Sequence, residues 1–373
     1  MGVTKQLPVQ CEPNIAGTIK DRPEDFIVDE IPLYEPCGTG EHLYFGVRKT
    51  NMSHDALMNT VARAMGVSTR AIGYAGRKDS SATTTQVLSV HIPCEGMEVP
   101  TDLGGAEIVW QSRHTNKLRL GHLLGNRFEI RIRGVDTNDV ELIQDRLQQL
   151  SVTGLPNTFG HQRFGTRKNN HNLGKALLLE AWDLLFQLLD DGDEEFARGA
   201  PPRHACSSIP KPIRRLWVNA LQSAIFNTVL QQRVIGETWD KPLVGDLICK
   251  HGARGRTFEA TAEDIDSEEF QSRVASIEVS PSGPLWGKKM REPTGYVFEQ
   301  ELAVLHTFGL DQEVFCRSNH YGTGARRPLR VPVANTRVSD GIDAHGPLVL
   351  VQFSLPAGSY ATIVIELLLN ASP

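Results

Sequence analysis

Residues 73–92 read GYAGRKDSSATTTQVLSVHI, and their sequence changes midway from a loop-like pattern to a strand-like one. In the second half, Leu88, Val90 and Ile92 alternate with polar residues, and this period of two predicts a half-buried strand. In the first half, two glycines precede Asp79, so we expect this carboxylate in a loop that runs directly into a core strand. Catalytic groups concentrate in loops that a rigid scaffold holds. Asp79 is equally consistent with an ordinary turn or cap residue, because aspartate is favoured in turns.

The composition is ordinary for a globular protein. The chain has 373 residues, 40% hydrophobic and 22% charged, enough for one large domain or two smaller ones. No apolar run approaches the roughly 20 residues of a membrane span, and the first residues lack the apolar core of a signal peptide. The six cysteines include no CxxC pair, so neither a zinc site nor a disulfide framework is predicted. We therefore expect no membrane partner and a reducing compartment. The cytoplasm is our first expectation, and the nucleus is the alternative.

Charge is distributed unevenly along the chain. The net charge of −5 argues against indiscriminate binding of nucleic acid. Residues 111–133 nevertheless hold six cations against Glu129 alone, and residues 157–175 and 314–339 contain no acid. Residues 126–133 alternate, which predicts a strand with its apolar residues toward a core and its arginines outward. That arginine face is either the solvated side of an antiparallel strand or a surface for RNA phosphates.

Local patterns predict several elements. Strands are expected over residues 25–31 and 42–49, and a helix capped by Ser53 is expected to end near Met65. Residues 279–289 are rich in proline and glycine, which is typical of a loop.

The tail suggests how the domains are arranged. Residues 349–355 and 360–369 are apolar and flank a turn at residues 356–359, so we expect a hairpin of two strands. Strands this apolar need an existing sheet to bury them. The C-terminal segment is therefore expected to rejoin the N-terminal domain, with the middle of the chain as an insertion.

The stretch around Asp79 also resembles a known family motif. AGRKDSSATTTQ at residues 75–86 is similar to the AGxKDxxAxTxQ motif of the TruD-type tRNA pseudouridine synthases. Further matches follow the order of that family along nearly the whole chain. They are PEDFxV at residues 23–28, GxGEHL at 38–43, LRLG at 118–121, GNxF at 125–128, PNxFGxQRFG at 156–165 and LPxGS-aromatic-AT at 355–362.

The resemblance implies a site and a chemistry. Asp79 would be the catalytic nucleophile, in a reaction that needs neither a metal nor an organic cofactor. Lys78, its neighbour, is expected to point to the opposite face and to contact phosphate. The remaining expected substrate-binding residues are Phe26, Asn157 and Tyr360, with Phe159 as a further wall.

These residue types suit a flipped-out uridine. Taking a base out of the stack costs a few kcal/mol, and stacking on an aromatic side chain offsets this by about 1–3 kcal/mol per base. The amide of Asn157 can donate to a uracil carbonyl and accept from N3–H. The alternatives are core packing for Phe26 and Phe159 and a turn position for Asn157.

We expect a mixed α/β (α+β) fold. Residues 1–154 plus 325–373 would form a catalytic domain on a largely antiparallel sheet, and residues 155–324 an inserted α/β domain, with RNA in a basic cleft between them. The resemblance implies isomerisation of uridine 13 of tRNA, by a monomer in our expectation, with other structured RNAs open as partners. Whether Asp79 attacks C1′ directly or assists a glycal route stays open.

Two other functions also stay open. The chain has Ser80 and Ser81 where family members often carry basic residues, and Glu366 begins Glu-Leu-Leu where Arg-Glu-Leu is common. A non-catalytic tRNA-binding or tRNA-folding protein would tolerate these departures. A metal-dependent hydrolase using Asp79 ranks lower, because the motif holds no second carboxylate or histidine to complete a metal site.

Overall fold

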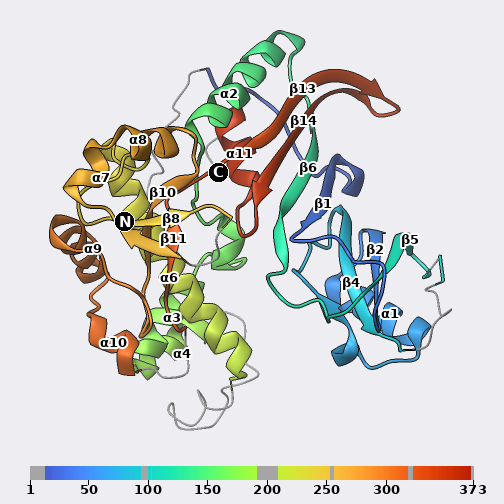
Figure 1. Ribbon diagram of the computed structural model, residues 1–373, viewed down its shortest axis with the longest axis horizontal. Coiled ribbons are helices and arrows are strands. Elements are labelled where there is room, and N and C mark those ends of the chain that lie inside the picture. Colours follow the sequence, from blue (N-terminus) through green and yellow to red (C-terminus); the bar gives the residue numbers. More distant parts are fainter. Residues whose placement is uncertain are drawn as a thin grey trace. The chain divides into compact units, whose positions relative to one another are not determined.

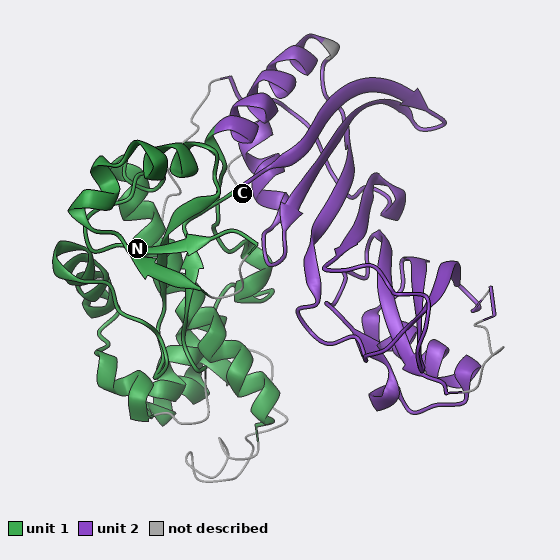
Figure 2. Cartoon of the chain, in the orientation of Figure 1, with its two compact units in different colours: residues 1–10, 153–331 green, residues 11–152, 332–373 purple. Residues whose placement is uncertain are grey.

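The computed structural model describes residues 13–93, 100–101, 103–190, 209–252, 256–317 and 322–370 (Figure 1). These residues form two compact units (Figure 2). Among them, unit 1 comprises residues 153–331, and unit 2 comprises residues 13–152 with 332–370. Both units contain helices and strands, which confirms the predicted α+β class.

Unit 2 is built on one eight-stranded sheet. Its order is β13-β14-β6-β1-β4-β2-β5, with β3 paired to β4. The pairing of β1 with β4 is parallel, and the other pairings of this sheet are antiparallel, as predicted. The strands are β1 (Phe26–Pro32), β2 (His42–Thr50), β3 (Gly73–Tyr74), β4 (Thr83–His91), β5 (Ala106–His114), β6 (Leu123–Arg133), β13 (Ala334–Asp343) and β14 (Gly346–Pro356).

Strand β4 lies inside this sheet and follows the loop of Asp79. Leu88 and Val90 are fully buried, as the alternation predicted. Ser89 on the opposite face is fully buried too, so β4 is covered on both faces instead of one. The Ser89 hydroxyl accepts a hydrogen bond from the Leu118 amide at 3.0 Å, which gives this polar group a partner inside the protein.

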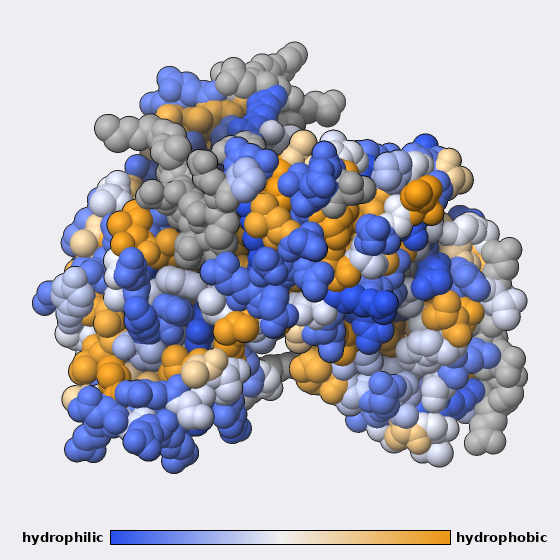
Figure 3. All heavy atoms as spheres, turned by 90° about the horizontal axis from the view of Figure 1, so that it is seen from above, coloured by the Kyte–Doolittle hydropathy of each residue, from blue (hydrophilic) through white to orange (hydrophobic). Residues whose placement is uncertain are grey.

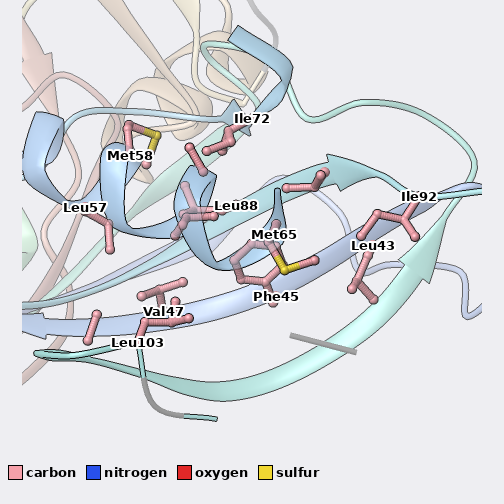
Figure 4. Packing of buried hydrophobic residues seen from close by; sticks show 14 residues of the cluster. Leu43, Phe45, Val47, Leu57, Met58, Met65, Ile72, Leu88, Ile92 and Leu103 are labelled. Atoms are coloured by element: carbon pink, nitrogen blue, oxygen red, sulfur yellow. The ribbon is translucent and has the colours of Figure 1, made fainter. Parts of the chain in front are cut away.

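Helix α1 (His54–Met65) begins and ends where the sequence predicted. The Ser53 hydroxyl accepts from the Ala56 amide at 3.1 Å, and Gly66 ends the helix with a left-handed φ of 63°. Its apolar stripe packs against β2 and β4, where Met65 lies beside Phe45 (Figure 4). Each such buried side chain contributes about 1.5–3 kcal/mol, so α1 holds β4, and the loop before it, in place.

The end of the chain corrects one prediction. Residues 346–356 form β14 between β13 and β6, so the C-terminal segment does complete the sheet of unit 2. Residues 361–369, however, form helix α11 (Ala361–Leu369) and not a second strand of a hairpin. Seven of its nine residues are buried, and a helix that is apolar nearly all round is a buried one. The third helix of unit 2 is α2 (Val140–Thr153).

Unit 1 combines a four-stranded sheet, in the order β11-β10-β8-β9, with a two-stranded pairing of β12 and β7. Its strands are β7 (Leu155–Pro156), β8 (Leu247–Lys250), β9 (Thr257–Glu259), β10 (Val279–Leu285), β11 (Ala325–Pro328) and β12 (Arg330–Val331). Its described helices are α3 (Asn170–Leu178), α4 (Trp182–Asp190), α6 (Lys211–Ile235), α7 (Ala262–Asp266), α8 (Glu268–Ala275), α9 (Gly295–Thr307) and α10 (Gln312–Arg317).

Strand β10 overturns the predicted loop for residues 279–285, while residues 286–289 lie outside any strand or helix, as predicted. Its first half pairs with β8 and its second half with β11, and almost all of it is buried. Proline lacks an N–H and is tolerated in strands only where that donor is not needed. Pro281 instead accepts from the Leu329 amide through its carbonyl at 2.8 Å.

Within the described ranges, no helix is both long enough and apolar enough to cross a bilayer. On the face drawn in Figure 3, hydrophobic residues lie in small groups among hydrophilic ones. Such exposed apolar residues are normal on protein surfaces.

Candidate active site

Asp79 lies in the loop between β3 and β4, and its side chain is 47% exposed. One carboxylate oxygen, Oδ2, is 3.1 Å from the ammonium of Lys20. Lys20 has a left-handed φ of 63°, which is uncommon for a residue other than glycine. Such conformations persist where the surrounding structure fixes them, and they cluster at functional sites.

The same ammonium connects Asp79 to a second predicted residue. Lys20 Nζ lies 4.3 Å from the centre of the Phe26 ring, a cation–π distance. Phe26 is 4% exposed and packs edge-on against Phe128. Lys20 thus bridges Asp79 and Phe26 in unit 2. Sequence reasoning missed it, because a lysine 59 residues from Asp79 in an unpatterned segment gives no signal.

A second lysine holds the main chain of the loop. Lys49 on β2 is 1% exposed, and its ammonium donates to the carbonyls of Met52 at 2.5 Å and Asp79 at 2.8 Å. Burial lowers the pKa of Lys49, and the nearby charge of Asp79 opposes that shift. The main chain of Asp79 is therefore held by a buried side chain, while its carboxylate stays accessible to solvent.

Lys78 has a different environment from the one expected. Its ammonium lies 2.9 Å from Glu30 and donates to the Asn126 amide oxygen at 2.6 Å, and both charged side chains are almost fully buried. Glu30 also accepts from the Val87 amide at 2.8 Å. Burial lowers the pKa of Lys78, while Glu30 raises it. A contact of Lys78 with phosphate stays a prediction, and this buried placement does not favour it.

The other residues of interest in unit 2 lie on α11 or directly after Asp79. Tyr360 is half-buried at the N-cap of α11. Glu366, one of the departures from the family pattern, is half-buried within that helix. Ser80 and Ser81, the other departures, are exposed directly after Asp79.

Arg133 shows that the outward face of β6 is not simply a row of free cations. Its guanidinium pairs with Asp25 at 2.6 Å and with Asp343 at 2.8 Å, and its side chain is 11% exposed. Arg133 alternates with the buried Ile130 and Ile132, as predicted, but its guanidinium is paired and largely covered. Asp25 is 1% exposed and needs this counter-charge, which the sequence pattern could not show.

Asn157 and Phe159 belong to unit 1. The pairing of β7 with β12 places Asn157 beside the end of β11, where its amide nitrogen donates to the Pro328 carbonyl at 2.9 Å. Arg327 donates to both the side-chain and main-chain oxygens of Asn157. The carbon at the centre of that guanidinium lies 4.0 Å from the Phe159 ring centre.

Arg327 therefore joins Asn157 and Phe159 as Lys20 joins Asp79 and Phe26. Phe159 is 6% exposed, and its main chain exchanges two hydrogen bonds with the side chain of Asn227. The acid-free segment 314–339, in which Arg327 lies, was the available sequence signal. Among the predicted site residues, Asp79 and Phe26 are thus brought together in unit 2, and Asn157 and Phe159 in unit 1.

The described part of the chain contains no group of three or more His, Cys, Asp or Glu side chains arranged to hold a metal ion. The metal-dependent hydrolase therefore gains no support from the arrangement of these side chains.

Comparison with known proteins identifies the family. The sequence model of the family described as tRNA pseudouridine synthase D (TruD) matches residues 5–189 and 183–367. A tRNA pseudouridine synthase D of Anaeromyxobacter sp. is 37% identical over 99% of this chain and 95% of its own length. That of Geobacter metallireducens is 35% identical over 95% of each chain.

A solved structure shares the fold. The crystal structure of the putative tRNA pseudouridine synthase D (TruD) from Methanosarcina mazei superimposes with a TM-score of 0.76, at 24% identity, over 99% of this chain and 97% of that one. The sequence matches, which span most of the chain, decide the assignment. The chain belongs to the tRNA pseudouridine synthase D (TruD) family.

Proposed function

We propose that the chain converts uridine 13 of tRNA to pseudouridine, with Asp79 as the nucleophile. The observation that carries this proposal is the environment of Asp79, whose main chain Lys49 holds and whose exposed carboxylate Lys20 orients. A nucleophile needs such a fixed position together with access to its substrate.

The reaction balances without a co-reactant. The bond between N1 and C1′ breaks, the uracil turns while it stays bound, and C5 forms the new bond to C1′. The hydrogen on C5 leaves as a proton, and N1 gains one. Because C1′ is inaccessible in a stacked helix, the uridine is flipped out first.

Each predicted residue has a role in this proposal. Phe26 and Tyr360 form aromatic walls for the flipped uracil, with Phe159 as a further wall. The amide of Asn157 reads the uracil edge, since an amide offers both a donor and an acceptor to the uracil. Unit 2 is then the catalytic domain and unit 1 the inserted one, and the protein acts as a monomer in the cytoplasm.

The test uses tRNA transcripts labelled with tritium at uracil C5. Wild type is expected to release tritium from a transcript with uridine at position 13 and none from one with cytidine there. Asp79→Ala should release none, while Asp145→Ala, which alters an exposed carboxylate on α2, should match wild type. Tight binding of all transcripts without release would instead support the non-catalytic tRNA-binding protein.

A further inference from the structure

A cavity of about 370 Å³ opens on unit 2 beside β5 and the segment that follows it. It is lined by Tyr34, Glu35, His114, Asn116, Lys117, Arg119 and His122. Pockets for small ligands usually measure about 300–1,000 Å³, so this one suits a single nucleotide better than a larger group. None of the roles given to Asp79 and its partners uses these side chains.

The aromatic wall of the cavity is held rigidly. The Tyr34 ring stacks on His114 with 5.1 Å between centres and meets His122 edge-on. The Tyr34 hydroxyl is 2.7 Å from His122 Nδ1, and the Cys37 amide donates to His114 Nδ1 at 3.3 Å. A wall fixed in this way loses little conformational freedom when a ligand binds.

A buried tyrosine behind this wall connects two parts of the cavity lining. Tyr44 is 2% exposed, and its hydroxyl donates to the Asn116 carbonyl at 2.8 Å while lying 3.3 Å from the Tyr34 hydroxyl. Tyr34 and the loop of Asn116 are therefore connected through one buried side chain.

The charges at the cavity favour an anion. Lys117 and Arg119 are its cations, and Glu35 is its one carboxylate. The Lys117 ammonium already donates to the Arg70 carbonyl at 2.9 Å, whereas Arg119 is exposed. A guanidinium suits phosphate because it can donate two parallel hydrogen bonds. A planar wall beside a guanidinium is the combination that binds one unpaired nucleotide, the base by stacking and the phosphate by the arginine.

The cavity is also connected to the loop of Asp79. Gly121, in the segment that lines the cavity, donates to the carbonyl of Ala75 at 2.8 Å. Gly73 approaches the Leu118 carbonyl so closely that no Cβ would fit there. The segment that lines the cavity therefore contacts residues 73 and 75, which lead into the loop of Asp79.

We propose that this cavity is a second RNA site, which holds one unpaired nucleotide of the tRNA at a position separate from the reacting uridine. Its base lies against Tyr34 and His114, and its phosphate pairs with Arg119. The identity of the ligand as RNA rests on the proposed function. The nucleotide is unpaired in this proposal, because a base must be splayed out of its helix before it can stack on protein side chains.

The first experiment measures tRNA binding by proteins that carry Asp79→Ala, so that no reaction occurs. Adding Arg119→Ala is expected to weaken binding about 5- to 10-fold and to reduce the slope of affinity against salt by about one phosphate contact. The matched control is Arg63→Ala, an exposed arginine on α1 outside the cavity, which should leave both values unchanged. Equal thermal midpoints of the two variants establish that Arg119→Ala is folded.

The second experiment locates the nucleotide. Transcripts with 4-thiouridine at single unpaired positions are irradiated on the protein, and one position is expected to cross-link to Tyr34 or to residues 114–122. Arg119→Ala should reduce that cross-link. The proposal would be overturned if the cross-links were confined to other parts of the chain and Arg119→Ala bound the transcripts as tightly as its parent. It would also be overturned if Arg119→Ala weakened the binding of polyglutamate but not the binding of the transcripts.

Tritium release separates this proposal from the proposed function. If wild type isomerises uridine 13 and Arg119→Ala has the same KM, only the second RNA site is wrong. If wild type releases no tritium but its tRNA binding depends on Arg119, the RNA site stands without the activity. With both correct, Arg119→Ala raises KM with little change in kcat.

Discussion

Two lysines hold Asp79 from different sides, and each acts on a different part of the residue. Lys20 contacts the carboxylate, while Lys49 contacts the main-chain carbonyl. A buried ammonium such as that of Lys49 is costly unless it is hydrogen-bonded, and its two carbonyl partners meet that need. Asp79 therefore keeps its position even when its exposed carboxylate changes partners.

Replacement of Lys20 should slow the reaction more than it destabilises the protein. Its ion pair with Asp79 is partly exposed, and such pairs are worth at most about 1 kcal/mol. We expect Lys20→Met to lower the single-turnover rate of tritium release roughly 10- to 100-fold, because a positioning contact is lost. Lys20→Arg, which keeps the charge, should retain part of the rate.

The contrary result for Lys20 is easily recognised. If Lys20→Met reacts at the wild-type rate while its thermal midpoint is unchanged, the lysine is a surface contact and not a positioning residue.

The family motifs were enough to name Asp79, Phe26 and Asn157 as candidates, whereas residue types alone left a turn or core role open for each of them. Neither could predict Lys20 or Arg327, because the contacts of these cations join residues 59 and 170 positions apart. The contact of Lys20 with Asp79 depends on which strands are neighbours. The partner of Lys78 was hidden for the same reason, since Glu30 lies opposite only because β1 pairs with β4.

At the scale of elements, the two errors in secondary structure have different causes. Residues 279–285 were predicted as a loop from their prolines and glycine, whereas the error at residues 361–369 concerns the type of element. A short apolar run can be a buried strand or a buried helix, and periodicity does not distinguish them. Both edges of β14 are taken, by β13 and β6, so residues 361–369 have no strand to pair with there. A helix satisfies their backbone internally, whereas residues 279–285 found partners on β8 and β11 in spite of two prolines.

Helix α11 should be a major contributor to the stability of unit 2. Ile363 is fully buried, and truncating such a side chain leaves a cavity. We expect Ile363→Ala to lower the free energy of unfolding by about 2–5 kcal/mol, measured by urea titration with far-UV circular dichroism. Thr362→Ala, at a half-buried neighbouring position, should change it by less than about 1 kcal/mol.

The contact between β8 and β10 should make unit 1 sensitive to acid. His251 Nε2 is 3.0 Å from the Ser280 hydroxyl, and burial, with the charge of Arg330 adding to it, lowers the pKa of His251 to about 4. Between pH 6.5 and 4 the unfolded chain binds a proton that the folded chain does not, so stability falls as the pH falls through this window. The loss by pH 4.5 is about 2–3 kcal/mol.

The measurement compares unfolding free energies at pH 7 and pH 4.5. His251→Gln should lose less stability between these values than wild type, while His306→Gln, an exposed control on α9, should lose as much as wild type. An identical loss in all three proteins would show that His251 titrates normally.

At the scale of the whole molecule, the sequence predicted correctly that the apolar C-terminal strand joins an existing sheet, since β14 pairs with β6. What no composition or motif could show is a cavity such as the one beside Tyr34, since its walls come from separate segments. The net charge of −5 did not show which cations are available to RNA either, because some of them, such as Arg133, are paired with carboxylates inside the protein.

Arg133 connects distant parts of the chain, since Asp25 and Asp343 lie 108 and 210 residues from it. Removing one partner of a buried pair leaves an uncompensated charge, at a cost of about 3–5 kcal/mol. We expect Arg133→Met to lower the urea midpoint accordingly, because Asp25 is 1% exposed. Arg131→Met, at a half-exposed position on the same strand, should stay within about 1 kcal/mol of wild type.

The position of β6 between β1 and β14 has a consequence for the protein during its synthesis. Arg133 ends β6, but its partner strand begins only at Gly346, so at ~5–20 residues per second the ribosome needs roughly 10 to 40 s to supply it. Throughout that interval one edge of β6 offers unpaired amides and carbonyls, which is a template for pairing with other chains. Nascent chains interrupted before residue 346 should consequently be the aggregation-prone form of this protein, and a chaperone would be most useful to them in that interval.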